Sequence, residues 1–239
     1  MLGLGLGLHK QNSYRDKIPT LGIMAKYKFN NGSGQILTDY SGNNNNAQLG
    51  SSSSSDTNDP TWDSQGLVFG GDDYALIPNT ALVSGNNDLT MIVAAKVTDI
   101  SVQRCLMSYG TKVSGSLPYI AQSNANTVIL NTYNAAVSIN YTPGENPYMV
   151  TFRYTASNLT LDGIINNDIV NKVSYVYSAP LNFVASNGAF GVRKVDGVYH
   201  HAGNIFYGLI YNRALSDAEI VRVYKNIKSD LATRGVLLP

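Results

Sequence analysis

Short apolar runs, separated by Gly, Asn and Pro about every ten residues, fill most of this chain. The clearest runs are Leu89–Val97, 104–109 and 148–154, and the others are 23–29, 67–69, 74–77, 119–121, 127–133, 136–141, 158–161, 189–192 and 205–211. Many short strands with turn residues between them are typical of an all-β sandwich or barrel, and not of βαβ units. With only 14% charged residues among 239, the composition also suits a turn-rich β-protein.

One helix is expected, directly after the last of these runs. Ser216 and Glu219 stand at the spacing of a capping box, and Gly235 is a natural helix stop. The stretch between them has one apolar stripe at helical spacing, formed by Ile220, Val223, Tyr224, Ile227 and Leu231. We predict that this helix lies across the sandwich and leaves residues 234–239 free to reach a partner.

Glycines and acids mark the expected turns. Residues 70–73 read as a hairpin-type turn, and Asp162-Gly163 as an Asp-Gly turn that closes a hairpin. Gly42 and Gly71 occupy turn positions that require a positive φ.

Residues 1–20 form a glycine-rich arm in which Leu2, Leu4, Leu6 and Leu8 alternate with glycine. An extended conformation would place these leucines on one face, where they could dock into another protein. The alternative is a disordered terminus. The segment has neither a basic n-region nor a small-residue cleavage site, so we expect it to be retained in the mature protein.

Charge and hydropathy exclude several classes of partner. A net charge of +1 provides no basic surface for nucleic acid, and no apolar run approaches the roughly 18 residues of a membrane span. We therefore expect neither nucleic-acid binding nor membrane insertion. Cys105 is the single cysteine, so an intrachain disulfide is impossible and packing in a core is the expected role.

Five segments in a fixed order resemble the LamG-like branch of the concanavalin A-like lectin/glucanase superfamily. They are YKFNNGSGQ (27–35), DYSGNNNNAQL (39–49), LVFGGDDYALIP (67–78), YMVTFRYTASNLTLDG (148–163) and IYNRALSDAEI (210–220). The resemblance covers about residues 23–224. It implies a concanavalin A-like jelly-roll β-sandwich with one C-terminal helix, in which strand 23–29 pairs with strand 205–211. The expected organisation is an attachment arm at 1–20, the sandwich at 21–215, and a helix and tail at 216–239 packed on the sandwich.

The superfamily includes glucanases, but the carboxylates that hydrolysis needs are missing from the expected places. A retaining glycosidase uses two carboxylates about 5–5.5 Å apart. The two glutamates, Glu145 and Glu219, have no partner at motif spacing, and the neighbours Asp72 and Asp73 would point to opposite faces of a strand. The pair His200-His201 has no third ligand at a zinc-site spacing. We predict that the chain is not an enzyme and requires no cofactor.

Calcium is the one metal for which the sequence offers a candidate site. Asp39, Asn43 and Asn45 offer hard oxygen ligands within one loop. Related domains add an acid just before the last strand, where this chain has Ile205-Phe206-Tyr207-Gly208 and no carboxylate. Two alternatives therefore stay open: a calcium site, or a loop that folds on its own Asx-turn hydrogen bonds.

Tyrosines supply possible platforms for sugar. The candidates lie in expected loops or strand ends and are Tyr109, Tyr119, Tyr133, Tyr175, Tyr177 and Tyr199. Strand alternation should bury about half of them. Trp62 stands where the resemblance implies a buried tryptophan, so we expect it in the core.

These features favour a non-enzymatic surface protein of a tailed bacteriophage virion: a fibre, an appendage or a capsid-associated protein, made in the host cytoplasm. Its lectin-like domain would contact host-surface glycans, with many copies on the particle, held to other virion proteins through the N-terminal arm and the C-terminal tail. The alternatives are a structural capsid decoration protein that binds no sugar, and a secreted bacterial carbohydrate-binding adhesin module.

Overall fold

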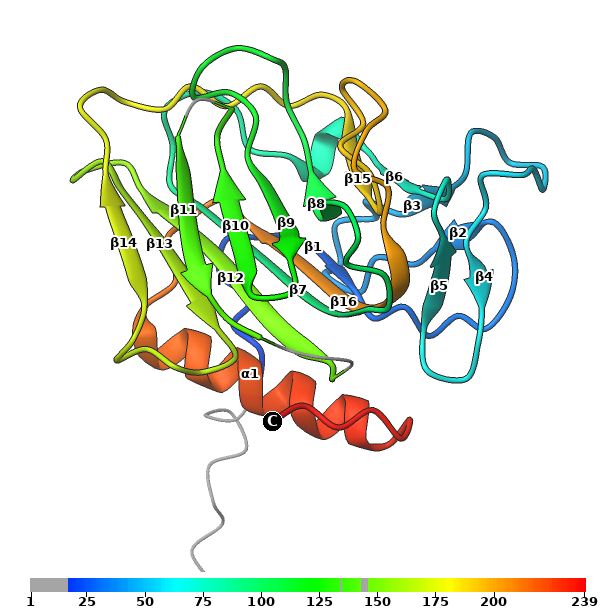
Figure 1. Cartoon of the computed structure of the whole chain (residues 1–239). Coiled ribbons are helices and arrows are strands. Elements are labelled where there is room, and N and C mark those ends of the chain that lie inside the picture. Colours follow the sequence, from blue (N-terminus) through cyan, green and yellow to red (C-terminus); the bar gives the residue numbers. More distant parts are fainter. Residues whose placement is uncertain (1–16, 134, 143–145) are drawn as a thin grey trace, which may run out of the picture.

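The computed structural model describes residues 17–133, 135–142 and 146–239. Two antiparallel sheets face each other, with the main apolar core between them and one helix beside them (Figure 1). This confirms the expected all-β jelly-roll sandwich with a C-terminal helix. Within the described ranges, no helix is both long and apolar enough to cross a membrane.

The first sheet, sheet A, has the strand order β14-β13-β12-β7-β16-β5-β4, and β1 pairs with β16 beside β5. Its strands are β1 (Ile23–Tyr27), β4 (Thr61–Trp62), β5 (Leu67–Gly70), β7 (Leu89–Val97), β12 (Tyr148–Thr155), β13 (Thr160–Ile165), β14 (Val173–Val176) and β16 (Ala202–Tyr211).

The second sheet, sheet B, has the order β11-β10-β9-β8-β15-β6-β3-β2. Its strands are β2 (Ile36–Leu37), β3 (Ala47–Leu49), β6 (Ala75–Ile77), β8 (Arg104–Ser108), β9 (Tyr119–Asn124), β10 (Thr127–Asn131), β11 (Ala136–Asn140) and β15 (Gly188–Phe190), and a short 3-10 helix, η1, spans Asn79–Ala81.

The central strands of sheet A are buried on both faces. Along β7, Met91 and Val93 pack in the core between the sheets, whereas Ile92 and Ala94 pack in a second cluster under the helix. Adjacent strand residues point to opposite faces, so an apolar run without polar alternation is what a doubly covered strand requires.

The helix, α1 (Asp217–Ala232), covers the outer face of sheet A. Its capping box is complete: the Ser216 hydroxyl accepts from the Glu219 backbone, and the Glu219 carboxylate accepts from the Ser216 backbone. Hydrogen bonds from Arg213 hold the pKa of Glu219 down at about 2. All five residues of the predicted stripe are buried, namely Ile220, Val223, Tyr224, Ile227 and Leu231.

The C-terminal tail packs on its own domain, in line with the expected organisation of residues 216–239 and not with the expectation that residues 234–239 lie free. Gly235 adopts a φ of 75°, and the Val236 backbone N–H donates to the Leu231 carbonyl, so the chain turns back after the helix. Val236 and Leu238 are buried in the cluster under the helix. Hydrophobic side chains in alternate tail positions therefore dock the tail on its own domain.

The first and last strands pair, as predicted. β1 runs antiparallel to the second half of β16, with Ala25 opposite Ile210 and Tyr27 opposite Gly208. Just before β1, the Pro19 carbonyl accepts a hydrogen bond from the buried Tyr211 hydroxyl at 3.0 Å. The chain thus enters the domain next to the strand that leads into the helix. Residues 1–16 of the predicted arm lie outside the described residues.

Two predicted turns are wrong. Asp162 and Gly163 lie in the middle of β13 and close no turn. Glycine is required at position 163 because a Cβ there would meet Ile139 and Leu130 of the facing sheet at 2.7 and 2.8 Å. The glycine serves sheet packing and not a turn. Residues 70–73 do not close a hairpin either, since β5 belongs to sheet A and β6 to sheet B. Gly42 and Gly71 do adopt the predicted positive φ.

Candidate functional site

A pocket of about 240 Å³ opens at one end of the sandwich, between the end of β11, the loop after β13 and the helix. Two short segments and the helix face contribute its lining, which consists of Ile139, Asn140, Tyr141, Ile165, Asn166, Asn167, Asp168, Asn171, Tyr224 and Pro239. It is smaller than the roughly 300–1,000 Å³ of pockets for drug-sized ligands. Its size suits one compact polar ring.

Apolar side chains form the inner part of the pocket. Ile139 and Ile165 are buried and belong to the core between the sheets. The half-buried Tyr141 stacks at a tilt of 52° on Tyr148, with ring centroids 5.4 Å apart. Tyr148 is itself fixed by a 2.6 Å hydrogen bond from its hydroxyl to Gln122. The Tyr141 ring is therefore held in place by the core.

A paired acid and amide form the rim. The Asp168 carboxylate accepts hydrogen bonds from the Asn171 backbone at 3.1 Å and from its side-chain amide at 2.9 and 3.1 Å. Both residues are exposed, as is Asn167 between Asn166 and Asp168. An oriented carboxylate with neighbouring amides offers acceptors and donors side by side.

Asn166 ties this loop to sheet A. Its backbone N–H donates to the Met149 carbonyl at 2.7 Å, and its side-chain oxygen accepts from the Met149 N–H at 2.9 Å. Asn166 has a φ of 54°, a conformation that asparagine tolerates better than most residues. The loop therefore starts from a fixed point on β12.

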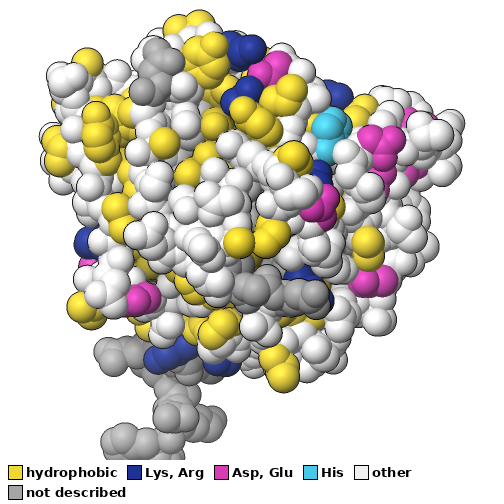
Figure 2. All heavy atoms as spheres, in the orientation of Figure 1, with side chains coloured by type: hydrophobic (Ala, Val, Ile, Leu, Met, Phe, Trp, Pro, Cys, Tyr) yellow, Lys and Arg dark blue, Asp and Glu magenta, His cyan; other side chains and the backbone are white. Residues whose placement is uncertain are grey.

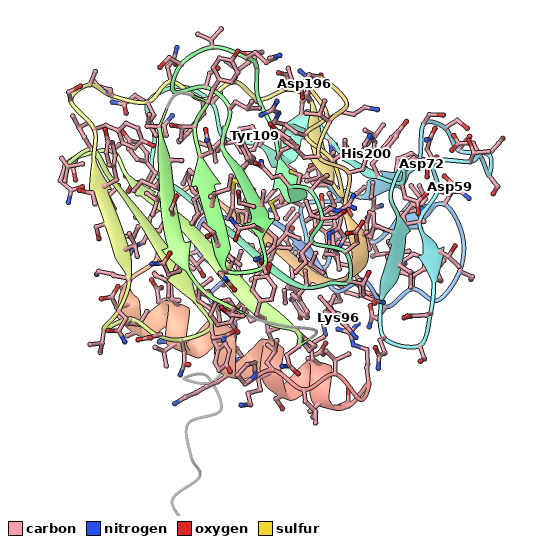
Figure 3. The ribbon with its side chains drawn as sticks, in the orientation of Figure 1. Asp59, Asp72, Lys96, Tyr109, Asp196 and His200 are labelled. Atoms are coloured by element: carbon pink, nitrogen blue, oxygen red, sulfur yellow. The ribbon has the colours of Figure 1, made fainter. Side chains whose placement is uncertain are left out.

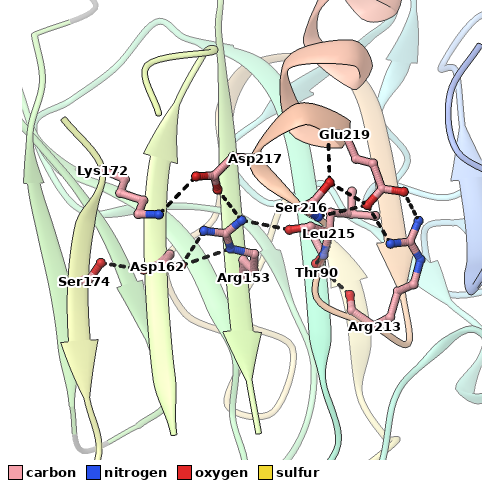
Figure 4. A network of polar contacts seen from close by, with 10 residues as sticks. All are labelled: Thr90, Arg153, Asp162, Lys172, Ser174, Arg213, Leu215, Ser216, Asp217 and Glu219. Carbon is pink, nitrogen blue, oxygen red and sulfur yellow. Dashed lines mark hydrogen bonds and ion pairs between the residues drawn. The ribbon is translucent and has the colours of Figure 1, made fainter. Parts of the chain in front are cut away.

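A network of charges fixes the other end of the loop (Figure 4). Lys172, next to Asn171, lies 3.3 Å from Asp217 in the first turn of α1, and Asp217 lies 2.6 Å from Arg153. Arg153 also donates to both Asp162, at 3.0 and 2.6 Å, and the Leu215 carbonyl. Burial lowers the pKa of Arg153, but the bonds to Asp162 and Asp217 outweigh this and raise it. The charged side chains thus join β12, β13, the pocket loop and the helix.

The helix and the tail complete the lining of the pocket through Tyr224 and Pro239. Tyr224 is buried, and burial raises the pKa of its hydroxyl, which donates to the Pro239 carbonyl. Lys228 donates to the same oxygen. The end of the returning tail, Pro239, is thus part of the pocket lining.

The predicted calcium ligands do come together, on the first strand and away from this pocket. The side-chain amides of Asn43 and Asn45 donate to the Met24 carbonyl at 3.1 and 2.8 Å. The two Asp39 oxygens accept from the backbone N–H groups of Lys26, Ser41 and Asn45 and from the Ser41 hydroxyl. The Asn45 oxygen accepts from Thr80.

These contacts describe a loop that folds on its own hydrogen bonds. Each Asp39 oxygen already accepts two hydrogen bonds, so a cation would have to displace donors. The geometry favours the Asx-turn alternative, and calcium binding at Asp39, Asn43 and Asn45 stays a prediction to be tested.

The six candidate tyrosines divide by exposure. Tyr109 and Tyr119 are buried, and Figure 3 shows Tyr109 among the strands. Tyr177 and Tyr199 are half-buried, whereas Tyr133 and Tyr175 are exposed. Trp62, expected in the core, is half-buried: its ring packs on the core, and its indole N–H donates to the Gly34 carbonyl.

The residues considered for catalysis are mostly engaged in structure. Glu219 belongs to the capping box, and Glu145 lies outside the described residues. Asp73 is buried and accepts from the Gly70 backbone, while Asp72 is exposed. His201 is fully buried, whereas its neighbour His200 is half-buried on the loop seen in Figure 3. The buried Cys105 packs with Leu117, Tyr119, Ala121 and Ile129, which confirms its predicted role in packing.

The sequence reasoning missed the pocket. Its signal was the run Asn166-Asn167-Asp168 followed by Asn171, four polar residues directly after an apolar strand. In the sequence that run looks like an ordinary loop. In the structure, Tyr141 and Tyr224 lie beside it and complete the pocket.

The structure is a jelly-roll β-sandwich with a small pocket at one end. No protein-family profile and no curated protein matches the sequence. Among solved structures, the chain is similar to the CBM40 domain of the Ruminococcus gnavus IT-sialidase bound to alpha2,3 sialyllactose, with 18% identity, a TM-score of 0.50, and coverage of 59% of this chain and 83% of that one.

It is also similar to the Trypanosoma rangeli sialidase in complex with 2,3-difluorosialic acid, with 15% identity, a TM-score of 0.65 and 87% of this chain covered. A mutant of that sialidase displaying trans-sialidase activity gives 14% identity, a TM-score of 0.64 and 90% coverage. This chain spans about a third of the sialidase chains, 33% and 34%. At these identities the likeness establishes the fold alone.

Proposed function

We propose that this chain is a non-catalytic, lectin-like domain that binds a sugar residue of a glycan in the pocket at the end of β11. One observation carries the proposal: the fixed Tyr141 ring lies in the same small pocket as the oriented Asp168–Asn171 pair. A sugar ring needs an apolar surface for its C–H face and paired acceptors and donors for its hydroxyls. The carbohydrate-binding module among the similar structures supports this reading.

The charge of the pocket favours a neutral sugar. Asp168 is an exposed carboxylate on the rim, and Lys172, next to Asn171, is paired with Asp217. A sialate carboxylate bound at this rim would be repelled by the Asp168 carboxylate. We therefore expect neutral glycans to bind better than the sialylated ligand of the Ruminococcus gnavus module.

The test is a glycan array probed with a multimeric form of the protein. Wild-type protein should bind neutral glycans, and Asp168→Ala should weaken binding about 10- to 100-fold, the worth of hydrogen bonds to a charged group. Ser138→Ala, an exposed β11 change outside the pocket lining, is the matched control. The absence of binding to every glycan would refute the lectin proposal and leave the decoration-protein alternative.

The same preparation should release no sugar from the glycans that it binds. Glu219 is committed to Arg213 and the helix cap, with Arg213–Glu219 distances of 2.7 Å. Product formation, followed by chromatography, would show that the domain is an enzyme.

The setting that we propose is the surface of a tailed-phage particle, with the 1–20 arm as the attachment and many copies providing avidity for weak glycan contacts. The support is the LamG-like resemblance, together with the entry of the chain beside β16 and α1. Deleting residues 1–20 should abolish incorporation into particles, scored by immunoblot of purified virions. Normal incorporation of the deleted form would rule out the arm as the attachment.

A further inference from the structure

The sandwich has one edge at which β14 and β11 meet. β14 ends sheet A, β11 ends sheet B, and the two strands lie against each other (Figure 1). The pocket lies at one end of this edge, where β11 finishes and the loop before β14 begins.

Tyrosines gather at the other end of the same edge. The rings of Tyr175 and Tyr177 meet edge to face with centroids 4.8 Å apart, and the Tyr177 hydroxyl lies 2.8 Å from the Thr132 hydroxyl. Tyr175 remains 44% exposed, and Tyr133, next to Thr132, 36%. The C-terminal end of β14 lies at the upper left in Figure 1, and Figure 2 shows hydrophobic side chains on the surface in that region. Exposed aromatic rings on a polar surface mark a place where a ligand can stack.

Strand register shows that the pocket and the tyrosines share one side of sheet A. Val173 lies opposite Gly163 and Tyr175 opposite Leu161, on the face that packs toward sheet B. Ile165, in the pocket, is on that same face of β13. Because alternate residues share a face, Ser174 and Val176 point the other way. Tyr175 and the pocket therefore lie along the same edge of the sandwich, where β14 meets β11.

Building on the sugar pocket proposed above, we propose that this edge is the continuation of that site, a surface along which a neutral oligosaccharide lies, with Tyr175 stacked on a sugar further along the glycan. The four steps from Asn171 to Tyr175 correspond to about 13 Å of extended strand. A ligand that reaches both must be longer than the single sugar that the pocket holds. The domain then recognises the length of a glycan as well as its terminal unit.

The experiment compares array glycans that share a terminal sugar and differ in chain length. Wild-type protein should bind the longer members about tenfold more tightly, and Tyr175→Ala should lose this preference while keeping the affinity for the shortest member. Val176→Ala is the matched control, because Val176 neighbours Tyr175, is more exposed at 65%, and points to the other face. Thermal melts should show that both variants fold like the wild type.

The outcomes separate the two proposals. Binding without a length preference in the wild type, or a length preference that survives in Tyr175→Ala, would overturn the extended site and leave the pocket intact. Binding that Tyr175→Ala abolishes even for the shortest glycan would place the terminal sugar at the tyrosines and overturn the arrangement proposed here. No binding by any variant would overturn the pocket and the extended site together.

Discussion

The Arg153 guanidinium on β12 and the Asp217 carboxylate in the first turn of α1 lie 2.6 Å apart, although 64 positions separate them in the chain. With the bonds from Arg153 to Asp162, this contact ties the helix to sheet A and holds the loop that carries Asp168. The polar network therefore supports both the fold and the pocket.

Replacing Arg153 by Leu should destabilise the domain by about 3 kcal/mol, because it leaves Asp162 buried without a cation. Arg153 and Asp162 are each only 6% exposed. The double change Arg153→Leu with Asp162→Leu should recover most of the loss, since no unpaired charge remains. Urea denaturation measures both. Lys172→Met, which removes a more exposed pair, is the control and should cost under about 1 kcal/mol.

Stability should fall as the pH drops from about 6.5 to about 4, because His201 is buried neutral. Burial lowers its pKa from 6.5 to about 4, so in this range the unfolded chain binds a proton that the folded protein does not. The loss reaches about 3 kcal/mol at the acid end. In His201→Phe the contribution disappears, and the stability curve from chemical denaturation between pH 4 and 6.5 should flatten. An equally steep curve in the variant would assign the acid sensitivity to other groups.

Gly163→Ala should cost about 1–3 kcal/mol through overpacking. The new Cβ would lie 2.7 Å from the Ile139 Cδ1 atom and 2.8 Å from the Leu130 Cδ1 atom. Adding Ile139→Val removes one of these methyl groups and should restore part of the stability. Melting temperatures of the single and double variants test this, and a neutral Gly163→Ala would show that the sheets can separate there.

The docked tail gives a prediction with its own control. Leu238 is 3% exposed and Leu237 is 73% exposed. Leu238→Ser should lower stability by about 2 kcal/mol, since it removes a buried leucine side chain from the cluster under the helix, whereas Leu237→Ser should change little. Equal effects of the two substitutions in denaturant melts would mean that the tail is undocked in solution.

Calcium should not raise the melting temperature if the loop around Asp39 depends on its hydrogen bonds. A ligand that binds only the folded state must stabilise it. We expect identical melting curves in calcium and in EDTA. Asp39→Ala should lower the melting temperature, because it removes the carboxylate that accepts four hydrogen bonds. A shift in calcium that Asp39→Ala abolishes would establish the metal site instead.

Sequence patterns predicted the structural features that are determined by residues close together in the chain. The apolar runs of β1 and β16, the capping box at Ser216 and the apolar stripe of α1 are all local, and the structure has each of them. The strand β14 was missed because it has only four residues, most of which stay exposed at the edge of the sheet. Asp162-Gly163 was misread as a turn, because the facing residues Ile139 and Leu130, which require the glycine, are distant in sequence.

The candidate site was beyond the reach of local patterns for the same reason. Tyr141, Asp168 and Tyr224 come from three separate parts of the chain. A common site could not be predicted from sequence, because only the folded chain brings these three residues around one pocket.

The pairing of β1 with β16 has a consequence for how such a domain could spread among proteins. Residues 17–20 and the docked tail both lie on the helix side of sheet A, so the chain enters and leaves the domain on the same side (Figure 1). A unit with entry and exit on one side can be inserted into a surface loop of an unrelated protein with little strain on the recipient.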